Sequence, residues 1–215
     1  SRQASPLHEP AAGENGSAVW IAPEDRATVD RLLTRWNLSA GRPLVVICPG
    51  ARSHIKRWEA IRLAALANRL IEEMHVEVVL TGEPDEGPLI HEILQAMRQR
   101  AYSGVGQTTI RQLAALLQRA SLVITNDSAA LHLACAVRVP VLVIFGPTDP
   151  RKYGPTGPRD RVLQRRLFCV PCEQSLCRFH HECMRFIPVD EVYDTAYQML
   201  TGGARGKVQG AREGQ

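Results

Sequence analysis

The sequence predicts an α/β fold in which a parallel sheet is covered by helices on both faces. Five short aliphatic segments, among them residues 44–48 and 141–145, are typical of strands that are apolar on both sides. Segments with helical periodicity separate these strands. Of the 215 residues, 45% are hydrophobic but only 5% are aromatic, so we expect an aliphatic, alanine-rich core of the kind that packs helices on a sheet.

The first helices and strands alternate in order. Residues Pro23-Glu24-Asp25 open a helix that runs to about Trp36, because proline fits a first helical turn and acids there complement the helix dipole. A strand over residues 44–48 follows, and apolar residues at helical spacing predict a helix over 59–74. Residues 76–80 form the next strand, and Thr81-Gly82-Glu83-Pro84 form a turn.

The alternation continues to residue 145. We expect, in chain order, a helix, a short strand and a second helix over residues 86–100, 102–105 and 109–119, with Thr108 as a candidate N-cap of the last. A strand, a helix and a final strand follow over residues 122–125, 128–136 and 141–145. This order of elements predicts a Rossmann-like architecture.

Polar or glycine-containing turns follow four of the predicted strands. They are Pro49-Gly50, Thr81-Gly82, Asn126-Asp127 and Gly146-Pro147. Since the carboxyl ends of parallel strands meet at one edge of the sheet, these turns are expected to cluster there, and that edge is where α/β proteins bind ligands. The clustering is a stronger signal than any single turn.

The chain is predicted to hold one domain with two appendages. Residues 1–18 are expected to be a flexible leader or linker, residues 19–202 the Rossmann-like domain and residues 203–215 a disordered polar tail. We find no apolar run of the roughly 20 residues needed to span a bilayer and no signal-peptide pattern. These features favour a cytosolic location, where the six cysteines would be reduced.

Two of the turns carry charged residues that suit an anionic nucleotide ligand. Gly50 allows close backbone approach to a ligand, and Lys56 places an ammonium at a helix start, which the dipole disfavours unless an anion is bound. Glu83, Asp85 and Glu86 precede a helix, where one carboxylate can accept hydrogen bonds from a ribose diol. The alternatives are a solvated loop anchored by a core tryptophan and, for most of the acids, simple stabilisation of a helix start.

The elbow after the fourth predicted strand is the most informative segment. Asp127 is either an N-cap or a ligand for sugar hydroxyls, and the two roles are compatible. The free amides of Ser128, Ala129 and Ala130 would then face a phosphate group. His132 lies one turn into the helix, where a lone histidine on an apolar helix is more often a core residue than a ligand.

Six cysteines divide into two groups. Cys48 and Cys135 are expected to be ordinary core residues. The other four have the pattern C-x2-C-x4-C-x5-C within a cysteine-rich loop over residues 169–183, and they are Cys169, Cys172, Cys177 and Cys183. They are candidate ligands for a structural zinc ion or an iron–sulfur cluster, although the spacing is not a familiar metal pattern. The alternative is an irregular loop with small buried thiols.

The net charge of +4 fits an anionic ligand or a loose contact with a membrane surface. It is too weak to argue for nucleic acid. A metal-cluster protein that binds nucleic acid through Arg159, Arg161, Arg165 and Arg166 remains an alternative hypothesis, but aromatic residues are sparse among these arginines.

Several motifs in register resemble glycosyltransferase family 9, the family of ADP-heptose:lipopolysaccharide heptosyltransferases. The strongest is the run from Thr125 to Ala134, followed by Val139-Pro140 and by residues 145–150, Phe-Gly-Pro-Thr-Asp-Pro. The segment Pro49-Gly50-Ala51 with Lys56-Arg57-Trp58 is similar to the family's lysine–tryptophan motif, and residues 81–86 are similar to its glycine-plus-acid turn. A cysteine-rich segment ending in Cys183-Met184 also recurs in the family. The resemblance covers roughly residues 40–200.

The resemblance implies the GT-B fold, in which two Rossmann-like domains enclose the active site. This chain resembles the C-terminal, donor-binding domain, so the N-terminal half, with the acceptor site and the acidic general base, would be supplied in cis or in trans. The implied reaction is inverting transfer from an ADP-heptose-like donor to a saccharide or glycolipid acceptor of the lipopolysaccharide-core type. It implies no required cofactor, no catalytic residue in this chain, no nucleic-acid partner, and a cytoplasmic location with peripheral contact at the inner face of the inner membrane.

The resemblance also implies a role for each site residue. Lys56 would contact the donor phosphates, and Glu86, or Glu83 in its place, would accept hydrogen bonds from the ribose. Asp127 would bind hydroxyls of the transferred sugar. The diphosphate would lie on the amides of Ser128, Ala129 and Ala130, with His132 supporting the same pocket. Two departures bear on the sugar: the family usually has glycine where Ala129 stands, and hydroxyl residues found in some members are absent at Ala51 and Arg52. A non-catalytic nucleotide-binding module is the alternative function.

Overall fold

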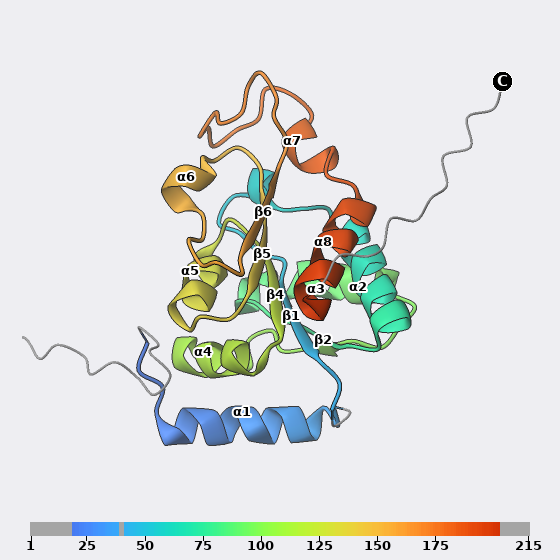
Figure 1. The fold of residues 1–215 in the computed structure, drawn as a ribbon, viewed down its shortest axis with the longest axis vertical. Coiled ribbons are helices and arrows are strands. Elements are labelled where there is room, and N and C mark those ends of the chain that lie inside the picture. Colours follow the sequence, from blue (N-terminus) through green and yellow to red (C-terminus); the bar gives the residue numbers. More distant parts are fainter. Residues whose placement is uncertain (1–18, 39–40, 203–215) are drawn as a thin grey trace, which may run out of the picture.

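The computed structural model describes residues 19–38 and 41–202, so the expected leader at 1–18 and the expected tail at 203–215 lie outside the described residues. Figure 1 shows a sheet with helices on both sides, which confirms the predicted fold class. The strands are β1 Leu44–Cys48, β2 Glu77–Leu80, β3 Tyr102–Ser103, β4 Leu122–Asn126, β5 Val141–Phe145 and β6 Arg161–Gln164. The α-helices are α1 Pro23–Arg35, α2 Ala60–Met74, α3 Gly87–Ala96, α4 Ile110–Arg119, α5 Ala129–Ala136, α6 Pro150–Tyr153, α7 Glu182–Arg185 and α8 Val189–Thr201.

All six strands of the sheet are parallel, in the order β3-β2-β1-β4-β5-β6. The central strand β1 pairs with β2 on one side and with β4 on the other, so that Val46 lies opposite both Val79 and Val123. The chain first builds outward from β1 to β3 and then returns to build from β4 to β6. Such a reversal opens a crevice at the carboxyl ends of the two central strands.

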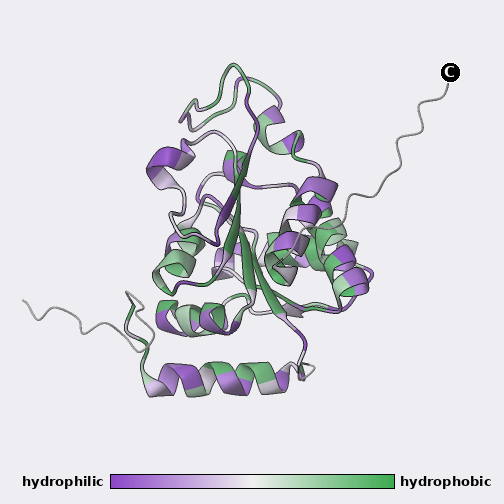
Figure 2. Cartoon of the chain, viewed as in Figure 1, coloured by the Kyte–Doolittle hydropathy of each residue, from purple (hydrophilic) through white to green (hydrophobic). Residues whose placement is uncertain are grey.

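Two apolar layers sandwich the sheet (Figure 2). Val45, Ile47 and Ile124 face the layer of α2, α3 and α8, while Val46, Val123 and Val143 face the layer of α4 and α5, against which α1 packs. Alternate residues of each strand therefore enter opposite cores, and β1, β4 and β5 are buried along their whole lengths. This double burial explains the uninterrupted apolar runs in the sequence.

The structure adds elements beyond residue 145 that the sequence analysis did not predict. The sixth strand, β6, is a partly exposed edge strand whose sequence, Arg-Val-Leu-Gln, is too short and polar to stand out. Helix α8 packs on α2, where the Arg69 guanidinium lies 3.7 Å from the centre of the Tyr193 ring. A helix-start signal was available, because Pro188 precedes it and Asp190 and Glu191 occupy its first turn.

Several boundaries also differ from prediction. The strand expected over 102–105 is only the two residues Tyr102–Ser103. The helix expected over 86–100 is a 3₁₀ turn, Pro84–Glu86, followed by α3, which ends at Ala96. It ends early because the buried Asn68 Oδ1 accepts the amides of Arg98 and Gln99, at 2.9 and 2.8 Å, in place of helical carbonyls. Thr109, not Thr108, caps α4, and its hydroxyl accepts the amide of Gln112.

Within the described ranges, the helices are all too short or too polar to cross a membrane.

Candidate functional site

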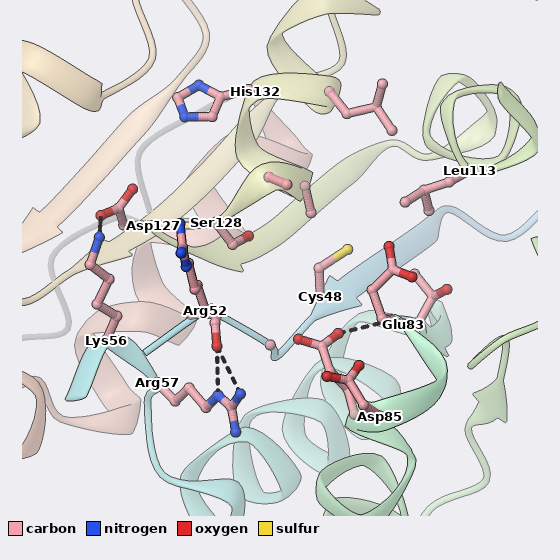
Figure 3. A pocket seen from close by; sticks show the side chains of 18 of the residues that line it. Cys48, Arg52, Lys56, Arg57, Glu83, Asp85, Leu113, Asp127, Ser128 and His132 are labelled. Atoms are coloured by element: carbon pink, nitrogen blue, oxygen red, sulfur yellow. Dashed lines mark hydrogen bonds and ion pairs between the residues drawn. The ribbon is translucent and has the colours of Figure 1, made fainter. Parts of the chain in front are cut away.

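A cleft of about 1230 Å³ lies at the carboxyl edge of the sheet. Its walls come from the loop after β1, the turn after β2 and the elbow between β4 and α5, the regions that the sequence analysis placed together (Figure 3). Lys56, Glu83, Glu86, Asp127, Ser128, Ala129, Ala130 and His132 all line it. The structure therefore brings every candidate donor-binding residue into one cavity.

Lys56 and Asp127 form the ionic centre of one wall. The Lys56 Nζ donates to Asp127 Oδ2 at 2.6 Å (Figure 3). The Thr148 hydroxyl donates to the same oxygen at 2.7 Å. The Asp127 side chain is only 8% exposed, whereas that of Lys56 is 26% exposed and reaches the cleft. A lysine 71 residues earlier in the chain thus holds the elbow carboxylate, and its ammonium stays accessible to a ligand.

Asp127 is not the N-cap that one sequence interpretation proposed. Ser128 is the residue before the first turn of α5, and it has extended backbone and no side-chain capping bond. Its hydroxyl instead lies 3.1 Å from that of Thr125. The N-cap was one of two compatible interpretations of Asp127, since acids are common at that position. In the structure the carboxylate instead binds Lys56, a cation from another loop.

The first turn of α5 faces the cleft with backbone donors. Ala129 and Ala130 are its first two residues, and amides at these positions have no carbonyl four residues earlier in the helix to bind. The helix dipole adds a partial positive charge at the same place. His132 is exposed, lines the cleft one turn further along and is not a core residue. Amides and ammonium together make this wall suited to an anion.

Glu86 forms the opposite wall. One of its carboxylate oxygens accepts the amide of Glu83 at 3.0 Å, and the residue lines the cleft. Burial raises the pKa of Glu86, while the hydrogen bond from Glu83 and the charge of Arg57 act in the opposite direction. A half-buried carboxylate with free acceptor capacity is suited to a pair of hydroxyls. Glu83 and Asp85 are more exposed.

Two residues fix the loop after β1. The Arg57 guanidinium donates to the Ala51 carbonyl through Nε and Nη2, at 3.0 and 2.8 Å. The Asn126 amide group donates to the Pro49 carbonyl at 2.6 Å and accepts the amide of Trp58 at 3.2 Å. Both ends of the loop are therefore attached to fixed points, one of them on β4.

The cysteine-rich loop lies beside this cleft. Cys169, Cys172, Cys177 and Cys183 line a second cavity of about 220 Å³. All four are free thiols, and burial together with the other three thiols raises the pKa of Cys183 to about 11. In the part of the chain that the structure describes, no three His, Cys, Asp or Glu side chains are arranged to hold a metal ion. The candidate structural metal therefore does not fit the side chains as they stand.

The remaining cysteines and the arginine cluster have other surroundings. Cys48 is buried, and its pKa is raised to about 12, mainly by burial and to a smaller extent by the negative charge of Glu86. Cys135 is only partly buried. Three of the four arginines of the nucleic-acid hypothesis donate to main-chain carbonyls nearby, and Arg165 also pairs with Glu191. Arg159, Arg161 and Arg166 are exposed.

Thr148, Arg57 and Asn126 have structural roles that the sequence analysis did not assign. Thr148 lies in a turn that the motif analysis quoted, but only its spatial neighbour Asp127 reveals its hydrogen bond. Arg57 and Asn126 act on backbone carbonyls, which leave no signal in a sequence. Asn126 had one clue, because a buried polar residue at a strand end requires partners.

Known proteins similar to this chain come from lipopolysaccharide synthesis. "Lipopolysaccharide heptosyltransferase 2" of Escherichia coli is 33% identical over 135 residues, which are 60% of this chain and 38% of that protein. "Lipooligosaccharide heptosyltransferase 2" of Campylobacter jejuni is 29% identical over 172 residues, 76% of this chain and 53% of that protein. The chain thus spans about half the length of its relatives, or less.

A solved structure and a family model that match this chain are also those of heptosyltransferases. The structure of E. coli ADP-heptose lps heptosyltransferase II superposes with a TM-score of 0.72 at 25% identity, covering 86% of this chain and 53% of that one. The model of glycosyltransferase family 9 (heptosyltransferase) matches residues 10–182. Together with the motifs that line the cleft, this match over most of the sequence shows that the chain belongs to glycosyltransferase family 9.

Proposed function

We propose that this chain is the donor-binding half of a heptosyltransferase, and that its cleft binds an ADP-heptose-like nucleotide sugar. The observation that carries the proposal is the pairing of two unlike walls in one cleft. Lys56 and the amides of α5 offer positive charge on one side, and the Glu86 carboxylate offers hydroxyl acceptors on the other. A nucleoside diphosphate presents a matching pair of groups, an anionic diphosphate and a ribose diol.

The proposed roles follow from this orientation. Lys56 and the amides of Ser128, Ala129 and Ala130 hold the diphosphate, with His132 beside them. Glu86 receives the ribose hydroxyls, with Glu83 as the alternative acceptor.

Asp127 is left with one free oxygen for the transferred sugar. Both of its hydrogen bonds use Oδ2, so that among the described residues Oδ1 has no partner and can accept a sugar hydroxyl.

The proposed reaction is inverting transfer to a lipopolysaccharide-type acceptor. An acceptor hydroxyl attacks the anomeric carbon of the donor sugar, and the bond between that carbon and the diphosphate oxygen breaks. A base outside these residues takes the proton of the attacking hydroxyl. Negative charge grows on the leaving diphosphate, next to the Lys56 ammonium and the first amides of α5. Donors fixed in place before that charge develops lower the barrier as well as bind the substrate. These groups need no cofactor to do so.

The acceptor site and the general base are proposed to lie in the other half of a two-domain enzyme. This part of the proposal is supported by coverage, because the relatives extend well beyond the matched region. The cytosolic location and the membrane contact stay predictions.

A thermal-shift screen tests the donor proposal. At a ligand concentration of about 100 times Kd, binding stabilises the folded state by about 2.7 kcal/mol, which raises Tm by about 5–10 °C for a domain of this size. We expect ADP and ADP-sugars to produce this shift, and UDP and GDP to produce less. No shift with any nucleotide would contradict the proposal. If the chain joined to its N-terminal half binds donor but transfers no sugar, the non-catalytic module is the better description.

A further inference from the structure

The Arg57 guanidinium binds a backbone carbonyl in the loop after β1. This guanidinium lies next to the cleft, yet it donates two hydrogen bonds to one backbone oxygen, the Ala51 carbonyl (Figure 3). A carbonyl has two lone pairs, so two donors from one rigid fork fix both its position and its direction. The loop from Pro49 to Arg52 is therefore attached to the segment that carries Lys56.

This loop forms one side of a narrow slot for the Glu86 carboxylate. A Cβ atom added at Gly50 would lie 1.5 Å from Glu86 Oε1, and one added at Gly82 would lie 2.2 Å from Oε2. The carboxylate thus lies between two backbone segments that touch it only because both lack side chains. Any movement of the 49–52 loop would change where Glu86 can place its oxygens.

The charges around Glu86 are mostly negative or neutral. Glu83 and Asp85 flank it on its own element, and the buried Cys48 thiol faces it from β1. Arg57 is the cation whose charge opposes them, and it favours the ionised form of Glu86 against the effect of burial. The same side chain therefore acts on Glu86 by position, through Ala51, and by charge.

We propose that Arg57 is a positioning residue for the nucleotide: by binding the Ala51 carbonyl it fixes the loop beside Glu86, and so holds that carboxylate where it can receive the ribose diol. This inference rests on the proposed function for the role of Glu86, but its structural part concerns the free chain alone. Arg57 itself does not need to touch the ligand.

Two substitutions of Arg57 separate its effect on the position of the loop from the effect of its charge. Arg57→Gln removes both the fork and the charge, whereas Arg57→Lys keeps the charge but cannot bind Ala51 with two donors. Arg98→Gln, at a side chain 79% exposed on the surface, is the matched control for loss of one arginine. Melting curves establish that each variant is folded.

The first measurement is the titration of the Glu86 carboxyl carbon by NMR in the free chain. In Arg57→Gln the midpoint moves to higher pH, while in Arg57→Lys and Arg98→Gln it stays close to that of the parent chain. An unchanged midpoint in Arg57→Gln would overturn the inference about charge, and this result does not depend on any ligand. Should Arg57→Gln fail to fold, the same titration in Arg57→Ala replaces it.

The second measurement is ADP binding by calorimetry over the same pH range. Above the Glu86 midpoint, Arg57→Lys and Arg57→Gln each bind ADP about tenfold more weakly, because the loop no longer holds Glu86 in place and losing a ribose hydrogen bond to that carboxylate costs about that factor. Arg57→Gln also loses affinity at a higher pH than the parent. Parent-like affinity in both variants would overturn the positioning role. If the parent chain does not bind ADP, or if Glu86→Gln binds it normally, the proposed function fails instead.

Discussion

The contact between Lys56 and Asp127 gives the sharpest test of the proposed cleft. In the free chain the Lys56 ammonium lies 2.6 Å from Asp127 Oδ2, and the proposed ligand would bring a diphosphate to the same ammonium. Lys56→Ala therefore removes a cation from the ligand and, at the same time, leaves a carboxylate facing it. The Thr148 hydroxyl still donates to that carboxylate, which is only 8% exposed.

The expected loss has two parts. Removing a charge-assisted hydrogen bond costs about 1.5–3 kcal/mol, which weakens ADP binding by about 10- to 150-fold. The unpaired Asp127 then repels the diphosphate in a partly buried site where charges are poorly screened, so we expect the upper half of that range. Asp127→Asn alone removes this repulsion and frees the ammonium, and it should bind ADP at least as tightly as the parent chain.

Isothermal titration calorimetry with ADP measures each arm of a double-mutant cycle. The double variant Lys56→Ala/Asp127→Asn should recover part of the affinity that Lys56→Ala loses. Lys152→Ala is the matched control, because Lys152 is exposed and pairs with Glu173 at the rim of the cleft. Unchanged ADP affinity in Lys56→Ala would remove Lys56 from the site. A double variant no tighter than Lys56→Ala would refute the argument about Asp127.

Three further outcomes follow from the packing of the site. Gly50→Ala forces the Glu86 carboxylate from its slot, since the new Cβ would lie 1.5 Å from Oε1, and calorimetry should show weaker ADP binding in a chain that still folds. Burial raises the pKa of Glu86, so the folded chain binds the carboxyl proton more tightly than the unfolded chain does. Glu86→Gln should therefore have a higher Tm than the parent near neutral pH, and the difference in Tm should close as the pH falls towards 4.5. An equal difference in Tm at every pH would contradict the direction of this pKa shift. Trp58 is 1% exposed, and its Nε1 donates to the Ile187 carbonyl at 3.2 Å. Trp58→Ala should therefore lower the free energy of unfolding, measured by urea titration, by about 3–5 kcal/mol, and Trp58→Phe should lower it by clearly less. Equal losses in the two variants would show that ring packing is not the cause.

Much of the fold follows from local patterns in the sequence. Strands such as β1 and β5 are buried on both sides and read as continuous apolar runs, which no amphipathic surface element would show. The edge strand β6 lacks that signal because one of its sides meets solvent, and it was missed. Helix α3 was predicted too long because its end depends on Asn68, a residue from another helix.

The candidate site, like the fold, could be predicted from the sequence only in part. Residues that follow strands could be placed at one edge from strand order alone, and the structure gathers Lys56, Glu86 and Asp127 in a single cleft. The contact between Lys56 and Asp127 could not be predicted, because it joins segments 71 residues apart in the chain and depends on side-chain direction. The N-cap interpretation of Asp127 failed for this reason.

The Asn126 side chain has a consequence for how this site can change. By binding both Pro49 and Trp58 it makes the end of β4 and the loop after β1 a single mechanical unit. Substitutions that alter the loop to suit a different sugar would therefore disturb the diphosphate wall as well, and those at the elbow would disturb the loop. Altered donor preference should then require paired changes, one on each side of this amide, and single changes should mostly reduce binding of every nucleotide sugar alike.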